Sequence, residues 1–153
     1  MRKLRGVIMG LLILFLAAPV FGQTLGTKVP GADVNKETWE VAIAATDSVS
    51  TYFLIPVHAE KIMIAFPVLT TGLIFFQAAL DSSRVSGGRT TSTFMPIRLN
   101  TAKQDSIAQG AGAFIFDATD ILQGALAARI ETGGAQASAV TIRVFIRKKP
   151  PGL

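Results

Sequence analysis

Residues 61–80 read KIMIAFPVLTTGLIFFQAAL, and this stretch decides the fold class. Its first part repeats apolar residues at every second position, which places one set on a single face: Ile62, Ile64, Phe66 and Val68. A period of two is typical of a β-strand with one face toward a core. After a break at 70–72, the segment 73–80 is apolar on both faces. A strand of that kind is covered on both sides, either in an assembly or beneath a loop.

Similar short segments recur on both sides of this stretch. Further strands are predicted at 39–44, 51–57, 94–99, 106–109, 127–131 and 140–147. Pro56 places the 51–57 strand near a sheet edge, because proline has no N–H to donate to a neighbouring strand. The tripeptide Phe114-Ile115-Phe116 is predicted to be buried.

The strand at 140–147 has the clearest alternation and closes the domain. One set of its residues is predicted to face the core: Val140, Ile142, Val144 and Ile146. The other set faces away: Thr141, Arg143, Phe145 and Arg147. About eight short strands with turns between them, and almost no helix-period segment, indicate an all-β fold. We expect an antiparallel β-sandwich, either jelly-roll-like or immunoglobulin-like.

The first 22 residues, MRKLRGVIMGLLILFLAAPVFG, have the organisation of a secretory signal peptide. Basic residues precede an apolar run at 7–18, and Val20 and Gly22 stand at the −3 and −1 positions of a cleavage site. The apolar run is shorter than the roughly 20 residues that span a bilayer, which favours cleavage over a retained membrane anchor. The expected location is exported, periplasmic or extracellular.

The remaining sequence divides into an arm, one domain and a tail. We expect a flexible linker or arm at 23–37, the β-sandwich at 38–148 and a C-terminal tail at 149–153. Without 1–22 the chain has 12 basic and 10 acidic residues, a net charge of +2. Because three of those basic residues lie at 147–149, we expect a solvated basic end and no nucleic-acid partner. The chain has no cysteine, which excludes disulfides and thiolate metal sites.

Residues suited to catalysis or metal binding are few. His58 is the single histidine, and its neighbours favour a turn over a general base. Asp117 and Asp120 could join Asp105 or Glu131 in a calcium site. Their spacing instead favours a turn with one helical turn in the segment 117–124, where Thr119 or Asp120 would be the N-cap. We expect no enzyme activity, no metal and no cofactor.

The candidate interaction surface consists of aromatic residues. Phe75 lies in the strand that is apolar on both faces, and Phe145 lies on the outward face of the last strand. Trp39 and Tyr52 could form a platform for stacking sugars, together with the polar loop at 81–92. Trp39 shares a face with apolar neighbours at 41 and 43, which favours a core position for it.

The order of segments from Val49 to Arg147 resembles small β-sandwich proteins in the structural-gene regions of tailed phages and prophages. Phe66-Pro67 corresponds to their mid-strand proline, and 73–77 (LIFFQ) to their "LTFQ" strand. The segment 122–133 corresponds to their late "F-G-A--LRI-SG" run. Two further matches are Asp81 in the acidic turn and Gln136 in the last loop.

The chain departs from that family pattern in two ways. Asp81 is followed by Ser82 instead of glycine, and an export signal precedes the domain, whereas virion proteins assemble in the cytoplasm. The resemblance implies a non-enzymatic structural or decoration module that works in many copies, in a virion-type particle. Its partners would be other copies of the chain or other structural proteins of the assembly. The alternative is a secreted module that binds glycans or another surface, with membrane contact only through an uncleaved N-terminal segment.

Overall fold

The computed structural model describes residues 24–31, 33–71, 73–80, 94–100, 103–104, 106–108 and 112–150. These residues form antiparallel β-sheets and one short helix, which confirms the all-β prediction. The predicted signal segment at 1–22 and the polar loop at 81–92 lie outside the described residues.

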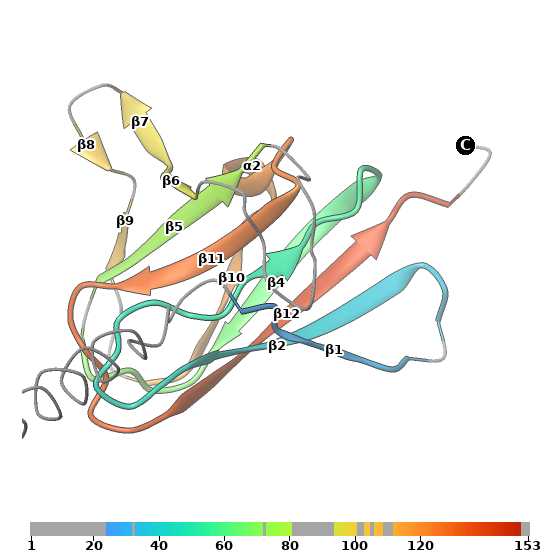
Figure 1. Cartoon of the computed structure of the whole chain (residues 1–153). Helices are drawn as coiled ribbons and strands as arrows, with labels where there is room; N and C mark the ends of the chain where they lie inside the picture. The colour runs from blue at the N-terminus through green and yellow to red at the C-terminus, as the bar shows by residue number, and fades with distance from the viewer. Residues whose placement is uncertain are drawn as a thin grey trace, which may run out of the picture.

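Sheet one has five strands in the order β1-β2-β12-β4-β10. Its strands are β1 (Thr27–Val29), β2 (Lys36–Ile43), β12 (Val140–Lys148), β4 (Ala59–Phe66) and β10 (Phe114–Asp117). The final strand of the chain therefore lies between β2 and β4, and all neighbours are antiparallel (Figure 1). The central position of β12 matches its long alternating sequence.

Sheet two has the strand order β3-β11-β5-β6, and β9 also pairs with β5. Its strands are β3 (Phe53–Leu54), β11 (Ala127–Thr132), β5 (Leu73–Ala79), β6 (Met95–Pro96) and β9 (Ser106–Ala108). Pro56 follows β3 at one end of this order, as predicted for a proline near a sheet edge. A separate pair consists of β7 (Arg98–Asn100) and β8 (Lys103–Gln104), and the helix α2 spans Thr119–Leu122.

The two sheets form separate layers and enclose one core between them (Figure 1). Ile64 and Val144 fill it from sheet one, and Ile130 fills it from sheet two. Phe76 of β5 stacks on Phe116 of β10 with ring centroids 6.1 Å apart, so this contact joins the sheets directly. Full burial of each such side chain contributes about 1.5–3 kcal/mol.

The predicted facing holds along β12 but fails at the end of β4. Ile142, Val144 and Ile146 are buried, while Phe145 is exposed, as the alternation predicts. Val68 was predicted to face the core with Ile64, yet 68% of its surface is exposed. The reason is that β4 ends at residue 66, just before a proline that cannot continue the ladder.

The segment predicted as a flexible linker or arm is paired with the domain over part of its length. Residues 27–29 form β1, and β2 already begins at Lys36. Gly26 donates its N–H to the Tyr52 carbonyl at 2.6 Å, and Tyr52 donates to the Thr24 carbonyl at 2.9 Å. A Cβ at Gly26 would lie 2.7 Å from the Glu40 carbonyl oxygen, so glycine permits this close approach.

Candidate interaction surface

The two residues predicted as a sugar-stacking platform are inside the protein. Trp39 is 4% exposed and shares the inner face of β2 with Val41 and Ile43, which confirms the core interpretation of Trp39. Tyr52 is fully buried, stacks at a tilt on Phe94, and has its pKa raised by that burial. The assignment of Trp39 and Tyr52 to an interaction surface is therefore corrected. Neither ring offers a face to a sugar.

Phe75 lies on the outer face of sheet two and is half-buried. Its neighbours across the strands are Glu131 of β11 and Ser106 of β9. Next to it, Arg129 donates from Nε to Gln77 Oε1 at 2.7 Å, and Gln77 Nε2 donates to Glu131 Oε2. The centre of this face is therefore a chain of polar groups that satisfy one another.

Phe145 lies on the outer face of sheet one, and 42% of its surface is exposed. Its direct cross-strand neighbour on β4 is Met63, which is half-buried. On the next row, Ala65 of β4 stands opposite Ile115 of β10, which is 67% exposed. We call these four residues, Met63, Ala65, Ile115 and Phe145, the apolar patch. Beside it, a shallow groove of about 240 Å³ follows Phe145 toward the charged end of β12.

Three of these four residues were not identified as surface residues from the sequence. Met63 and Ala65 alternate with Ile62 and Ile64, so their outward facing was available from the same pattern that predicted the core. Ile115 was predicted to be buried with its two phenylalanine neighbours, and that prediction is wrong. Successive residues of a strand face opposite sides, so the middle residue of three cannot share the inner face with the outer two.

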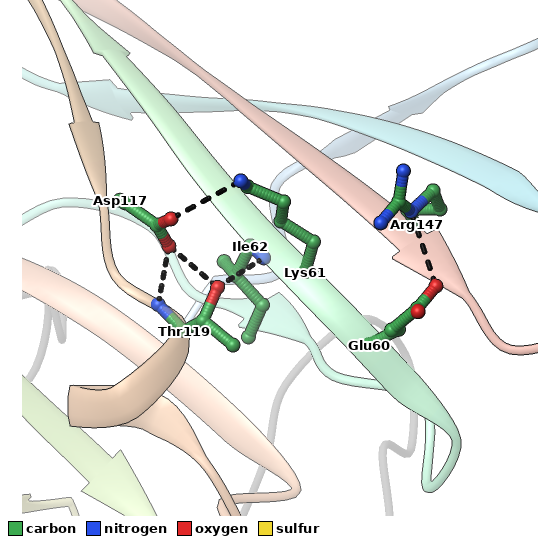
Figure 2. A network of polar contacts seen from close by, with 6 residues as sticks. All are labelled: Glu60, Lys61, Ile62, Asp117, Thr119 and Arg147. Carbon is green, nitrogen blue, oxygen red and sulfur yellow. Dashed lines mark hydrogen bonds and ion pairs between the residues drawn. The ribbon is translucent and has the colours of Figure 1, made fainter.

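Charged residues border the apolar patch and are neutralised by neighbours. Three ion pairs join adjacent strands here: Arg143 with Glu40 at 3.1 Å, Lys61 with Asp117 at 3.4 Å and Arg147 with Glu60 at 3.1 Å. Figure 2 shows the last two of these, with Lys61 directed toward Asp117 and Arg147 toward Glu60. Exposed pairs of this kind stabilise a fold by only about 0–1 kcal/mol. Their main consequence is a rim with no excess charge.

Asp117 holds the end of β10 against β4 (Figure 2). Its Oδ1 accepts hydrogen bonds from the Thr119 hydroxyl at 2.5 Å and the Thr119 N–H at 3.1 Å. Thr119 Oγ1 in turn accepts the Ile62 N–H at 3.0 Å. The bonds from Thr119, together with Lys61, lower the pKa of Asp117.

These contacts support the turn interpretation of the 117–124 segment. The predicted helical turn is present as α2, but its N-cap is Ala118, not Thr119 or Asp120. Asp117 is engaged by Thr119 and Lys61 and not by other carboxylates. Among the described residues no group of three or more metal-ligating side chains is present, and Asp105 lies outside them.

His58 lies in the turn before β4, as predicted, and lines a cleft of about 540 Å³. The cleft lies between this turn, α2 and the chain after β12, where the Lys149 N–H donates to the His58 carbonyl at 2.9 Å. Its floor consists of core residues such as Ile62 and Leu122 that are almost fully covered. Among the described residues that line the cleft, no acid is paired with His58.

No helix in the described parts of the chain has the length and apolarity to cross a membrane. Comparison of the sequence with protein-family models and with curated proteins finds no match.

Proposed function

We propose that this chain is a non-enzymatic structural or interaction protein, whose apolar patch docks onto a neighbouring subunit of a multi-copy assembly. The observation that carries the proposal is Phe145. Phe145 lies on the outer face of the central strand of sheet one and is 42% exposed. The apolar patch extends from it through Met63 to Ile115, which is 67% exposed. Contiguous apolar surface at the centre of a sheet face is typical of protein–protein contact.

The charges around the apolar patch support the same function. Protein interfaces have few charges at their centre and a polar rim. Here the cations Lys61, Arg143 and Arg147 stand at the border, each with its own carboxylate. A nucleic-acid surface needs unneutralised cations, so this arrangement favours a protein partner.

We further propose that the sandwich is jelly-roll-like and not immunoglobulin-like. In support, β2, β3, β4 and β5 alternate between the two sheets along the chain, and β10, β11 and β12 alternate again. An immunoglobulin domain instead keeps consecutive strands together in pairs in one sheet, A with B, D with E and F with G. Jelly rolls are common in viral capsid and lectin domains, which agrees with the phage-type resemblance.

We also propose that the chain is exported, with a virion-type particle as the alternative location. Thr24 and Gly26 bond to Tyr52, so cleavage after Gly22 would leave the contacts of the arm intact. Mass spectrometry of the native N-terminus in particle, membrane and soluble exported fractions tests this. A start at Gln23 in the soluble exported fraction supports export, and an intact chain concentrated in particles contradicts it.

The docking function is tested by the size of the species that the chain forms. We expect self-association to increase with concentration in sedimentation velocity, and Phe145→Ser or Met63→Ser to reduce the largest species. Val68→Ser is the matched control, because Val68 is 68% exposed but lies outside the apolar patch. A wild-type chain that stays monomeric and binds no hydrophobic dye would contradict the proposal.

A further inference from the structure

In the part of the chain that the structure describes, the strand β10 forms one edge of sheet one. The Ala118 N–H donates to the Ile62 carbonyl of β4 at 2.9 Å. Alternate residues of an antiparallel strand direct their backbone groups to opposite sides. Phe114 and Phe116 therefore point their backbone groups toward β4, and Ile115 and Asp117 point theirs away from the sheet. In the described chain, β10 is the last strand in the order of this sheet.

The side chains at this edge are incompletely covered. Ile115 is 67% exposed on the outer face. On the inner face Phe114 and Phe116 are half-buried, although each stacks on a core ring: Phe114 on Phe66 with centroids 5.1 Å apart and Phe116 on Phe76. An exposed, apolar strand edge is a template for pairing with another strand.

We propose that β10 pairs with β10 of a second copy of this chain, antiparallel and across a two-fold axis at Ile115. The two Ile115 residues then stand opposite each other, and each donates its N–H to the carbonyl of the other. Phe114 of each copy stands opposite Phe116 of the other, which adds an aromatic cross-strand pair on the inner face. The two copies of sheet one become continuous.

The sequence of the edge favours this register over registers that are shifted by one or two residues. A shift of one residue would place the outer face of one copy beside the inner face of the other. A shift of two would place Ile115 opposite Asp117. In the proposed register Asp117 stands opposite Ala113, which is small and uncharged, so no like charges meet. A two-fold contact requires a surface that is complementary to itself, and this edge meets that requirement.

This inference rests on the proposed function, because it names a second copy as one partner in the assembly. It uses the edge of sheet one, whereas docking through Phe145 uses the face. Ile115 belongs to both contacts, but the edge contact uses its backbone N–H and carbonyl, whereas docking through the face uses the side chains of the apolar patch. One edge contact and one face contact on each chain are sufficient for an assembly to grow.

The test is made in the Phe145→Ser background of the whole chain, where docking through the face is disabled. Sedimentation velocity is measured up to the highest soluble concentration for Phe145→Ser alone and with Ile115→Pro or Ile115→Thr added. Proline removes the outward N–H and is tolerated at strand edges, whereas threonine keeps the N–H and shortens the side chain. We expect Phe145→Ser to be dimeric. Ile115→Pro should weaken the dimer about tenfold or more, and Ile115→Thr should weaken it less.

A monomeric Phe145→Ser chain overturns the edge dimer, as does a proline variant that dimerises as well as the threonine variant. If Phe145→Ser forms the same largest species as wild type, docking through the face fails while the edge dimer stands. Circular dichroism shows whether each variant is folded. As a second measurement, Ile115→Cys supplies the single cysteine of the chain, and a short bis-maleimide should link two copies at that position. Val68→Cys, also exposed, is the control, and equal linking of both variants counts against the register.

Discussion

The outer faces of the two sheets differ in a way that their inner faces do not. Both sheets line the core with isoleucine and phenylalanine. Outside, sheet two joins Arg129, Gln77 and Glu131 into a polar chain, and the Arg129 guanidinium lies 4.7 Å from the centre of the Phe94 ring. Sheet one instead has apolar residues at its centre and ion pairs at its border. The first arrangement satisfies its own polar groups, and the second leaves apolar area for a partner.

This comparison separates stability from association. Substitutions on the outer face of sheet two should change the free energy of unfolding and leave association unaltered. Substitutions in the apolar patch of sheet one should reduce association and leave the free energy of unfolding almost unaltered. Substitutions on the inner face of either sheet should destabilise strongly, because both inner faces share one core.

The largest effect is expected at the contact between the sheets. Phe76→Ala removes a side chain that is 1% exposed and its stacking on Phe116, and should lower the free energy of unfolding by about 3–5 kcal/mol. Phe75→Ala, one residue away on the outer face, should lower the free energy of unfolding by clearly less. Urea denaturation monitored by the fluorescence of the buried Trp39 measures both. Equal costs would show that the outer face of sheet two is as tightly packed as the core.

A smaller effect is expected in the polar chain of sheet two. Gln77→Leu leaves Arg129 and Glu131 without the amide that joins them and should destabilise by about 1–2 kcal/mol. The size of the associated species in sedimentation velocity should be unaltered. Thr141→Leu on the exposed side of β12 is the control in sheet one and should shift stability by no more than about 0.5 kcal/mol. A change in association with Gln77→Leu would remove the contrast between the two faces.

At the end of sheet one, Glu37 is a stronger ion-pair site than the pairs around the apolar patch. Its carboxylate lies 3.0 Å from Lys28 Nζ and 3.1 Å from Lys148 Nζ, and its side chain is 13% exposed. Burial raises its pKa, but the hydrogen bonds from the two lysines outweigh burial and lower the pKa. Glu37→Gln should destabilise by about 1 kcal/mol at pH 7, and Glu40→Gln, with one exposed pair, by less.

The pH dependence of Glu37 follows from the direction of that shift. Its folded pKa lies below the unfolded value of about 4.5, so its stabilising contribution is complete above that pH. The contribution is lost as the pH falls through the folded pKa. The difference in stability between wild type and Glu37→Gln should therefore shrink on acidification, in urea titrations at a series of pH values. A difference that grows below pH 4.5 would show that the carboxylate is not stabilised by the lysines.

The smallest effect on stability is expected at the centre of the apolar patch. Phe145→Ser removes a half-exposed ring and should change the free energy of unfolding by no more than about 1 kcal/mol. The same substitution should still abolish docking through that face. Thermal unfolding and sedimentation of one preparation compare the two properties. A large loss of stability would mean that Phe145 belongs to the fold and not to an interface.

Most of the strands and inner faces follow from the local sequence. The period of two along 61–66 and 140–147 is a local property, because each residue of a strand faces the side opposite to its neighbour. The same rule identified Phe145 as outward-facing and Trp39 as a core residue. The same rule applies to Ile115, although three successive apolar residues favour burial of all three.

Which outward residues meet depends on the packing of segments that are distant in the sequence. Met63 contacts Phe145 because the last strand of the chain inserts between β2 and β4, and nothing in the local pattern of either strand specifies that order. The pairing of residues 24–29 with β2 and Tyr52 is also long-range, and it left no period in the sequence for prediction to use. Strand order is set by the packing of distant segments around a shared core. A sheet face used for binding therefore emerges only when those segments are brought together.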